Sequence, residues 1–339
     1  MTSRELVKAS LEFAGPERIP RQLWLLPWAE THFPNELRQI QQRYPDDIIS
    51  APACLRRPAP TQGDAYAPGV YLDEWGCRFE NAEAGIIGIV QQPLLADWQE
   101  VDTVRVPEEL LSVDVEQVNA FCRSTDRFVL SGCGPRPFEQ MQFIRTTENL
   151  LLDLAQPPAE FFVLRDRLHQ FYLKQLELWA GTEVDALTFL DDWGMQHAML
   201  ISPAMWRRLF KPLYRDYIEI AHAHGKYAFM HSDGYILDIL PDLIELGLDA
   251  INAQLFCMGV ERVGQCCRGR LTFWGEIDRQ YLLAYGTAEE IIAAVESVKQ
   301  SLYAGGGVIA QCEFGPAAKP ENVSLVFATW ERLSHSLRP

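Results

Sequence analysis

The sequence predicts an α/β protein whose strands close into a single (β/α)₈ barrel. Short apolar runs alternate with amphipathic helical segments along the chain, and eight such runs can be counted over the 339 residues. Several of the runs end in a polar residue, as strands do at the carboxyl end of a barrel. An open doubly wound sheet is the alternative, but no run is followed by a GxGxxG turn. Polar residues follow at least five of the runs, whereas an open sheet would place them after the one pair of strands at its switch point.

Composition favours one large soluble domain over residues 1–339. An apolar fraction of 48% can fill a barrel core, and barrels of this kind often exceed about 250 residues as one unit. The net charge of −16 argues against nucleic acid or an anionic membrane as a partner. Without a signal-peptide core, a membrane-spanning run or a disulfide framework among the eight cysteines, we expect a cytoplasmic protein that acts on a small molecule.

The first third of the chain contains two predicted strands and an insertion. A helix over 2–14 stops at Gly15-Pro16, and strands at 21–26 and 47–50 flank a helix at 34–43. Residues 52–97 are rich in Pro and Gly and include the alternating run GVYLDEWGCRFE. This texture predicts a β-hairpin insertion, which we expect to cover the site as a lid.

The rest of the chain follows a regular strand and helix period. A strand at 127–133 leads into a long helical region that ends near residue 181. Ser202 before Pro203 is typical of a helix start, and Thr287 with Glu290 forms a capping box. The further predicted strands are 184–190, 227–230, 250–253, 271–274 and 308–311, and the main helices are 203–222, 236–246, 288–302 and 321–334.

The run KYAFMHSDG, residues 226–234, is the expected centre of the site, because a buried strand there delivers His231 and Asp233. The preceding strand ends at Asp191 and Asp192. Side chains alternate along a strand, so one of these two aspartates should face the pocket while the other caps or salt-bridges outside. His231 and the pocket aspartate are candidates for acid–base chemistry, and Asp233 for metal binding or for capping the next helix.

Further polar residues end other strands or follow them. Glu276 is a candidate catalytic group, while Gln254 and Arg279 are candidates for substrate or cofactor binding. Trp193 is a candidate for cofactor stacking or simple packing. Cys312 directly follows the last predicted strand, where a free cysteine is often a buried, inert thiol.

An ordered set of motifs resembles the uroporphyrinogen decarboxylase superfamily, which includes corrinoid-linked methyltransferases. These motifs are DDWGMQHAMLISPAMWRRLFKP, FMHSDG, LPDLIELGLDAINAQ, FWGEIDRQ and GGVIAQCEFGPAAKPENV. The resemblance covers nearly the whole chain. It implies a TIM-type barrel with the site at the carboxyl ends of the strands.

The resemblance also favours one branch of that superfamily. True decarboxylases carry PxWxMRQAGR near the N-terminus to bind substrate carboxylates, and this chain has ERIPRQLWLLPWAE instead. In the methyltransferase branch, a His-x-Cys and a distant cysteine bind zinc. His231 and Cys312 match the histidine and the distant cysteine, and Asp233 stands where the first cysteine would be.

The resemblance therefore implies a methyltransferase with zinc on His231, Asp233 and Cys312, and a corrinoid as cosubstrate or on a partner protein. One alternative is a decarboxylase of a porphyrinogen or smaller acid, in which Asp191 or Asp192 would stabilise a protonated ring. Another is a non-catalytic carrier or sensor of a tetrapyrrole or corrinoid. The expected partners are a small-molecule substrate, a corrinoid protein and a second copy of the chain in a homodimer.

Overall fold

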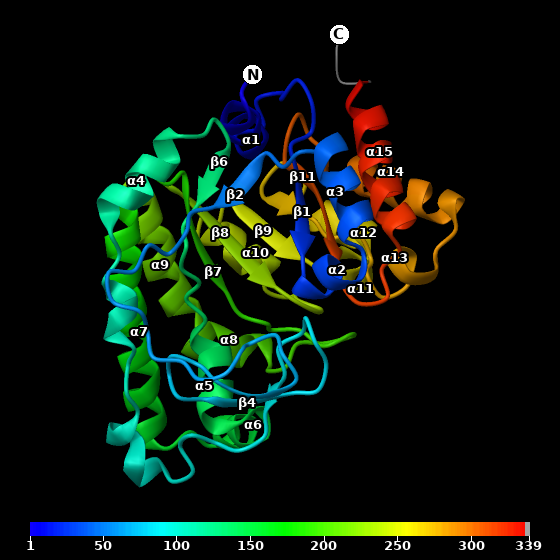
Figure 1. Ribbon diagram of the computed structural model, residues 1–339. Helices are drawn as coiled ribbons and strands as arrows, with labels where there is room; N and C mark the ends of the chain where they lie inside the picture. Colours follow the sequence, from blue (N-terminus) through cyan, green and yellow to red (C-terminus); the bar gives the residue numbers. More distant parts are fainter. Residues whose placement is uncertain (336–339) are drawn as a thin grey trace.

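The structure, a computed structural model, describes residues 1–335 and contains the predicted α/β barrel (Figure 1). Its eight main strands pair in parallel in the order β1-β11-β10-β9-β8-β7-β6-β2. The strands are β1 (Arg21–Leu25), β2 (Ile48–Ser50), β6 (Phe128–Leu130), β7 (Ala186–Leu190), β8 (Tyr227–Ser232), β9 (Ala250–Ala253), β10 (Thr272–Trp274) and β11 (Val308–Phe314). All eight predicted strands are confirmed, although β8 and β11 extend past their predicted ends.

Apolar side chains from alternate positions fill the barrel interior. Phe128, Phe229, Trp274 and Ile309, from four different strands, belong to one buried cluster. The first helix, α1 (Ser3–Leu11), adds Val7 and Leu11 to the same cluster and so closes the amino end of the barrel. The open end for a ligand is therefore the carboxyl end of the strands, as barrels of this type require.

The barrel is nearly closed, because hydrogen bonds from backbone and side chains connect β1 with β2 and with the residue before it. Asp47 N–H donates to the carbonyl of Arg21 at 2.8 Å, and the Gln22 amide donates to the carbonyl of Ile48 at 3.3 Å. The carboxylate of Asp47 also accepts hydrogen bonds from both Arg18 and the backbone of Arg21. Asp47 thus connects β1 with the start of β2.

Helices surround the strands and connect them in sequence (Figure 1). Ser202 and the Thr287–Glu290 capping box begin their helices as predicted. The remaining helices are α2 (Pro27–His32), α3 (Pro34–Arg43), η1 (Trp98–Thr103), η2 (Glu108–Leu111), α4 (Val115–Arg123), α5 (Pro137–Arg145), α6 (Thr147–Ala155), α7 (Ala159–Ala180), α8 (Pro203–Leu209), α9 (Lys211–Ala223), α10 (Leu240–Glu245), α11 (Leu255–Met258), α12 (Val260–Cys267), α13 (Leu282–Tyr285), α14 (Ala288–Leu302) and α15 (Pro320–His335).

The predicted single helix over 203–222 is wrong in one respect, since the structure divides it into α8 and α9 at Phe210. Pro212 stands in the first turn of α9. Proline has no backbone N–H and its ring clashes with the carbonyl four residues earlier, so a continuous helix through this point would be strained. The long helical region before residue 181 likewise consists of three helices, α5, α6 and α7.

The insertion contains a three-stranded antiparallel sheet, where a two-stranded hairpin was predicted. Its strands are β3 (Gly69–Leu72), β4 (Arg78–Asn81) and β5 (Ile89–Val90). Phe79 packs edge-on against Phe143 of α5, and Trp75 packs against Phe171 of α7. Figure 1 shows this sheet beyond the carboxyl ends of the barrel strands. Closure of residues 52–97 over the site stays a prediction.

Within the described part of the chain, no helix combines the length and the apolar character that crossing a membrane requires.

Candidate functional site

Asp192, His231 and Asp233 form a cluster at the carboxyl end of β7 and β8. His231 Nε2 lies 3.4 Å from Asp192 Oδ1 and 3.7 Å from Asp233 Oδ1. The backbone N–H of Asp233 donates to Asp192 Oδ1 at 2.8 Å, which ties the two loops together. One nitrogen and two carboxylate oxygens within 4.8 Å of one another are a possible ligand set for a metal ion.

The orientation of His231 is set by its neighbours on the adjacent strands. Its Nδ1 donates to Asn252 Oδ1 at 2.7 Å, and the Asn252 amide donates in turn to the carbonyl of Trp274. The Trp24 ring packs beside the imidazole with centroids 5.1 Å apart. Burial lowers the pKa of His231, but the hydrogen bond and charge of Asp192, together with the charge of Asp233, outweigh burial and raise it to about 9.

Arg279 lies among three carboxylates on the other side of Asp233. It pairs with Asp233, lies 2.9 Å from Glu313 and has its Nε 3.6 Å from Glu276 Oε1. Burial raises the pKa of Glu276 to about 8, and the charges of Asp233 and Glu313 add to this while Arg279 opposes it. One guanidinium is therefore shared by three acids, of which Asp233 and Glu276 were predicted site residues and Glu313 was not.

Glu139 in the first turn of α5 adds a further buried acid near the cluster. Burial and the charge of Asp192 raise its pKa to about 7, and its Oε2 has no hydrogen-bond donor among the described residues. Since α5 follows β6, this side chain comes from a third strand–helix unit. The acidic side chains of the site therefore come from several strand–helix units, and they can accept protons or bind cations.

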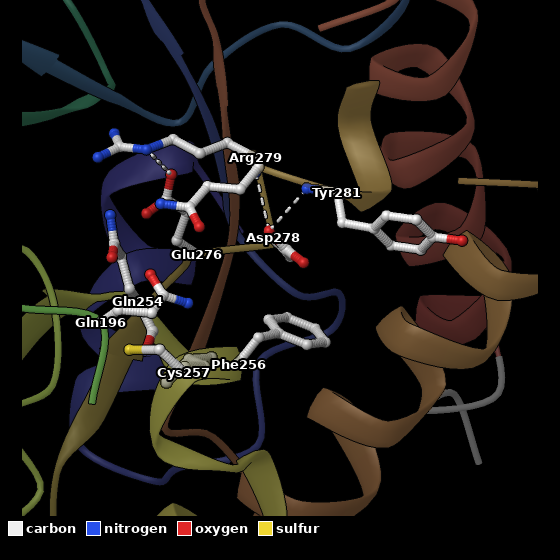
Figure 2. Close-up of a pocket in the computed structure, with 10 residues that line it drawn as sticks. Gln196, Gln254, Phe256, Cys257, Glu276, Asp278, Arg279 and Tyr281 are labelled. Carbon is white, nitrogen blue, oxygen red and sulfur yellow. Dashed lines mark hydrogen bonds and ion pairs between the residues drawn. The ribbon is translucent and has the colours of Figure 1, made fainter. Parts of the chain in front are cut away.

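A cavity of about 230 Å³ opens beside these groups (Figure 2). Glu276, Arg279 and Gln254 form part of its wall, and Gln254 also accepts the N–H of Gly234 at 3.1 Å. The other lining residues are Gln196, Leu255, Phe256, Cys257, Asp278, Gln280 and Tyr281. The structure therefore brings three sequence-predicted residues, Gln254, Glu276 and Arg279, to one cavity.

Asp191 and Trp193 face away from the pocket, so the structure does not place them where a substrate would bind. Asp191 is fully buried and accepts the N–H groups of Phe138 and Glu139 at 3.0 and 2.8 Å, which caps α5. Trp193 is also fully buried, and its ring stacks on Phe138 with centroids 4.2 Å apart. Alternation along the chain explains this result, because Asp192 between them faces inward.

Cys312 does not join the metal cluster that the resemblance implied for it. It lies beside Leu23 in the β1–β11 register and is completely buried within the core between strands and helices. Burial raises the pKa of its thiol well above the ordinary value. The neighbouring Glu313 faces the site instead, and Asp192 provides the third potential ligand.

Sequence reasoning missed Asn252, Glu139 and Glu313. Asn252 lies on β9, two residues before Gln254. Because side chains two residues apart on a strand point the same way, the reasoning that selected Gln254 would also have selected Asn252. Glu313 lies two residues beyond the predicted end of its strand, and the strand itself continues to Phe314. Glu139 carries no comparable signal, because acids are common in the first turn of any helix.

Similar folds occur in known structures. A methyltransferase from Methanosarcina mazei matches with a TM-score of 0.68 and 14% identity, covering 98% of this chain and 99% of that one. A B12-independent methionine synthase from Shewanella sp. W3-18-1 matches with a TM-score of 0.48 and 12% identity over 95% of this chain and 96% of that one. At 14% identity the likeness to the Methanosarcina mazei protein shows the fold alone.

Sequence comparison identifies the family. A search of curated proteins returned no match. The family model for uroporphyrinogen decarboxylase (URO-D), however, matches residues 70–333, which is more than half of the chain and includes β7 to β11 with the cluster at their ends. The chain therefore belongs to the URO-D family.

Proposed function

We propose that this protein is a methyltransferase that uses a metal ion, with zinc as the first candidate, held by Asp192, His231 and Asp233. The observation that carries the proposal is the spacing of the three donor atoms. Zinc binds nitrogen and oxygen at about 2.0–2.2 Å, so two ligands of a tetrahedral site lie about 3.3–3.6 Å apart. His231 Nε2 lies 3.4 Å from Asp192 Oδ1, which is inside that range, and 3.7 Å from Asp233 Oδ1, which is slightly above it. The three donor atoms all lie within 4.8 Å of one another, so a small adjustment would bring them to tetrahedral spacing.

The hydrogen bonding of the donors also suits a metal. His231 Nδ1 is engaged by Asn252, which leaves Nε2 as the nitrogen that faces both carboxylates. Asp233 Oδ1 is shielded from solvent and has no hydrogen-bond donor among the described residues, while Arg279 pairs with the other oxygen. Such a shielded, unpaired carboxylate oxygen is costly unless a ligand satisfies it.

A metal bound there would supply Lewis acidity, and more of it than a thiolate-ligated site because no sulfur donor belongs to the described cluster. Asn252 would keep His231 in position. Arg279 offsets part of the negative charge, and Gln254 and Glu276 are placed to orient a substrate in the adjacent cavity.

Membership of the URO-D family supports methyl transfer to a nucleophilic acceptor, because the family includes a methyltransferase branch. The chain also lacks the PxWxMRQAGR motif of the decarboxylases. The fold shared with a methyltransferase is compatible with that choice. We propose a corrinoid protein as the partner that exchanges the methyl group.

Decarboxylation of a porphyrinogen is a weaker candidate. The cavity of about 230 Å³ is below the range of about 300–1,000 Å³ in which drug-sized ligands bind, and a tetrapyrrole is larger still. Arg279 is the one positively charged residue among those that line the cavity, and three carboxylates already engage it. The same size argument opposes a carrier of a tetrapyrrole or corrinoid in this cavity.

The test is the zinc content of protein purified without a metal-affinity step, followed by a methylcobalamin and thiol assay. We expect about one zinc per chain, lost in His231→Ala and in Asp192→Ala and retained in Cys312→Ala. Folding of each variant is checked by circular dichroism. Folded wild-type protein that binds no zinc would refute the proposal and make a metal-free decarboxylase of a smaller acid the leading function.

A further inference from the structure

The cavity beside the metal cluster has a strongly acidic wall. Glu276 and Asp278 line it directly, and Asp233 and Glu313 lie behind Arg279. Asp278 Oδ1 accepts the N–H groups of Gln280 and Tyr281 at 2.8 and 3.2 Å, which hold this side chain in place. Three acidic side chains therefore lie around the single guanidinium of Arg279, and Asp278 adds a fourth to the wall of the cavity.

Arg279 is poorly placed to receive an anionic substrate. Its three contacts run to Asp233, Glu276 and Glu313, from three different strand–helix units, and in Figure 2 its side chain extends toward Glu276. A substrate carboxylate would have to displace one of these partners and would meet the charge of the others. The wall consequently disfavours anions.

One carboxylate oxygen in this wall lacks a hydrogen-bond donor. Glu276 is only 3% exposed, and its Oε1 accepts no hydrogen bond in the described part of the chain, because Arg279 Nε remains 3.6 Å away. A buried carboxylate oxygen in this state is expensive unless a cation or donor approaches it. The cavity is the side from which a ligand can do so.

Aromatic residues complete the wall. Phe256 and Tyr281 line the same cavity as Glu276 and Asp278, and all four are drawn in Figure 2. Aromatic faces attract methylated ammonium groups through cation–π interactions, and nearby carboxylates add Coulomb attraction. This pairing of rings and acids is the chemistry that recognises a small organic cation.

From these observations we propose that the cavity binds a small methylated ammonium compound as the substrate. The inference deepens the proposed function and rests on it, since the cation would occupy the cavity next to the Asp192, His231 and Asp233 cluster. It assigns a substrate class that fits the walls of the cavity.

The experiment compares two probes of the same shape by isothermal titration calorimetry: choline, and its uncharged isostere 3,3-dimethylbutan-1-ol. We expect choline to bind at least about tenfold more tightly, a difference of about 1.4 kcal/mol. The anion 3,3-dimethylbutanoate should bind more weakly than either. Tighter binding of the anion, or equal binding of choline and the alcohol, would overturn the proposal.

Substitutions locate the binding. Asp278→Asn should weaken choline binding about tenfold and leave binding of the uncharged alcohol unchanged, whereas Phe256→Leu should weaken choline more than the alcohol. Glu219→Gln removes the same charge from the exposed face of α9 and should change nothing. An effect of Glu219→Gln equal to that of Asp278→Asn would show that only net charge matters and would refute the site.

Measurements with and without zinc separate this inference from the proposed function. We expect choline to bind the zinc-loaded protein, because the cavity and the cluster are different places. Competition between zinc and choline would mean that the cation occupies the cluster, which refutes the inference. Zinc binding with methyl transfer but no preference for choline would support the proposed function and refute the choline site. A preference for choline in a protein that binds no zinc would support the choline site and refute the proposed function.

Discussion

Asn252 is the residue that connects His231 to the neighbouring strand, through His231 Nδ1 on one side and the carbonyl of Trp274 on the other. Replacing it by leucine removes both hydrogen bonds at similar volume. Partners of metal-binding histidines usually contribute about 10- to 100-fold to metal affinity. We therefore expect Asn252→Leu to weaken zinc binding by that factor, measured by competition with a chromogenic chelator. Asn119→Leu, on the surface of α4, serves as the control, and unchanged zinc affinity in Asn252→Leu would contradict the role.

Asp191 has a structural role that its position in the DDWG motif conceals. Its carboxylate accepts two backbone N–H groups at the start of α5 and the hydroxyl of Tyr214. An asparagine cannot accept from all three donors, so Asp191→Asn should lower the free energy of unfolding by about 2–4 kcal/mol. Urea denaturation measures this loss. Zinc content should stay at the wild-type level, and its selective loss without destabilisation would instead make Asp191 a site residue.

Glu276 should make stability depend on pH. Its pKa is raised to about 8 from an ordinary value near 4.5, so between these values the folded state keeps a proton that the unfolded state has released. The stabilisation of the folded state by this protonated carboxyl is fully present below the ordinary pKa. It is lost as the pH rises toward 8, at up to about 1.4 kcal/mol of unfolding free energy per pH unit. In metal-free protein, Glu276→Gln should reduce this decline. Parallel stability curves for the two proteins from pH 5 to 8 would contradict the assignment.

At the scale of elements, the loops after β7 and β8 meet backbone to backbone. A Cβ on Gly194 would lie 2.2 Å from Tyr235 N and 2.4 Å from the carbonyl carbon of Gly234. Because Asp192 and Asp233 stand on these two loops, Gly194→Ala should separate them and lower zinc affinity at least about tenfold, at a stability cost of about 1–3 kcal/mol. Gly181→Ala is the matched control, since its added Cβ is 3.4 Å from the nearest atom. Equal zinc affinity in the Gly194→Ala and Gly181→Ala variants would contradict the prediction that close contact of the two loops positions the metal ligands.

At the scale of the whole molecule, Asp47 closes the barrel. It is 1% exposed and accepts hydrogen bonds from Ser3 of α1, from Arg18 and from the backbone of Arg21. Asp47→Ala leaves these donors unpaired and should cost about 3 kcal/mol. We expect circular dichroism and tryptophan fluorescence to report one shared, shifted unfolding transition. Asp102→Asn breaks an exposed pair with Arg167 and should cost below about 1 kcal/mol, while a similar cost at both sites would deny Asp47 its closing role.

The order of the elements was predictable because local patterns carry it. Each barrel strand is a short apolar run, and each helix shows its own caps or breaks, as at Ser202 and Thr287. The division of the helix near Pro212 could also have been read locally, because a proline at that position interrupts the hydrogen-bond ladder. The third strand of the insertion, β5, is only two residues long and has no comparable local pattern.

Local patterns were enough to predict the barrel, the end at which the site lies, and the presence there of His231, Asp233, Gln254, Glu276 and Arg279. Which neighbour of each polar pair faces inward could be seen only in the folded chain. Strands buried on both faces are apolar throughout, so they show no polar alternation that would set the phase. Packing against the helices selected Asp192 over Asp191 and Glu313 over Cys312, and with them the donor atoms available to a metal.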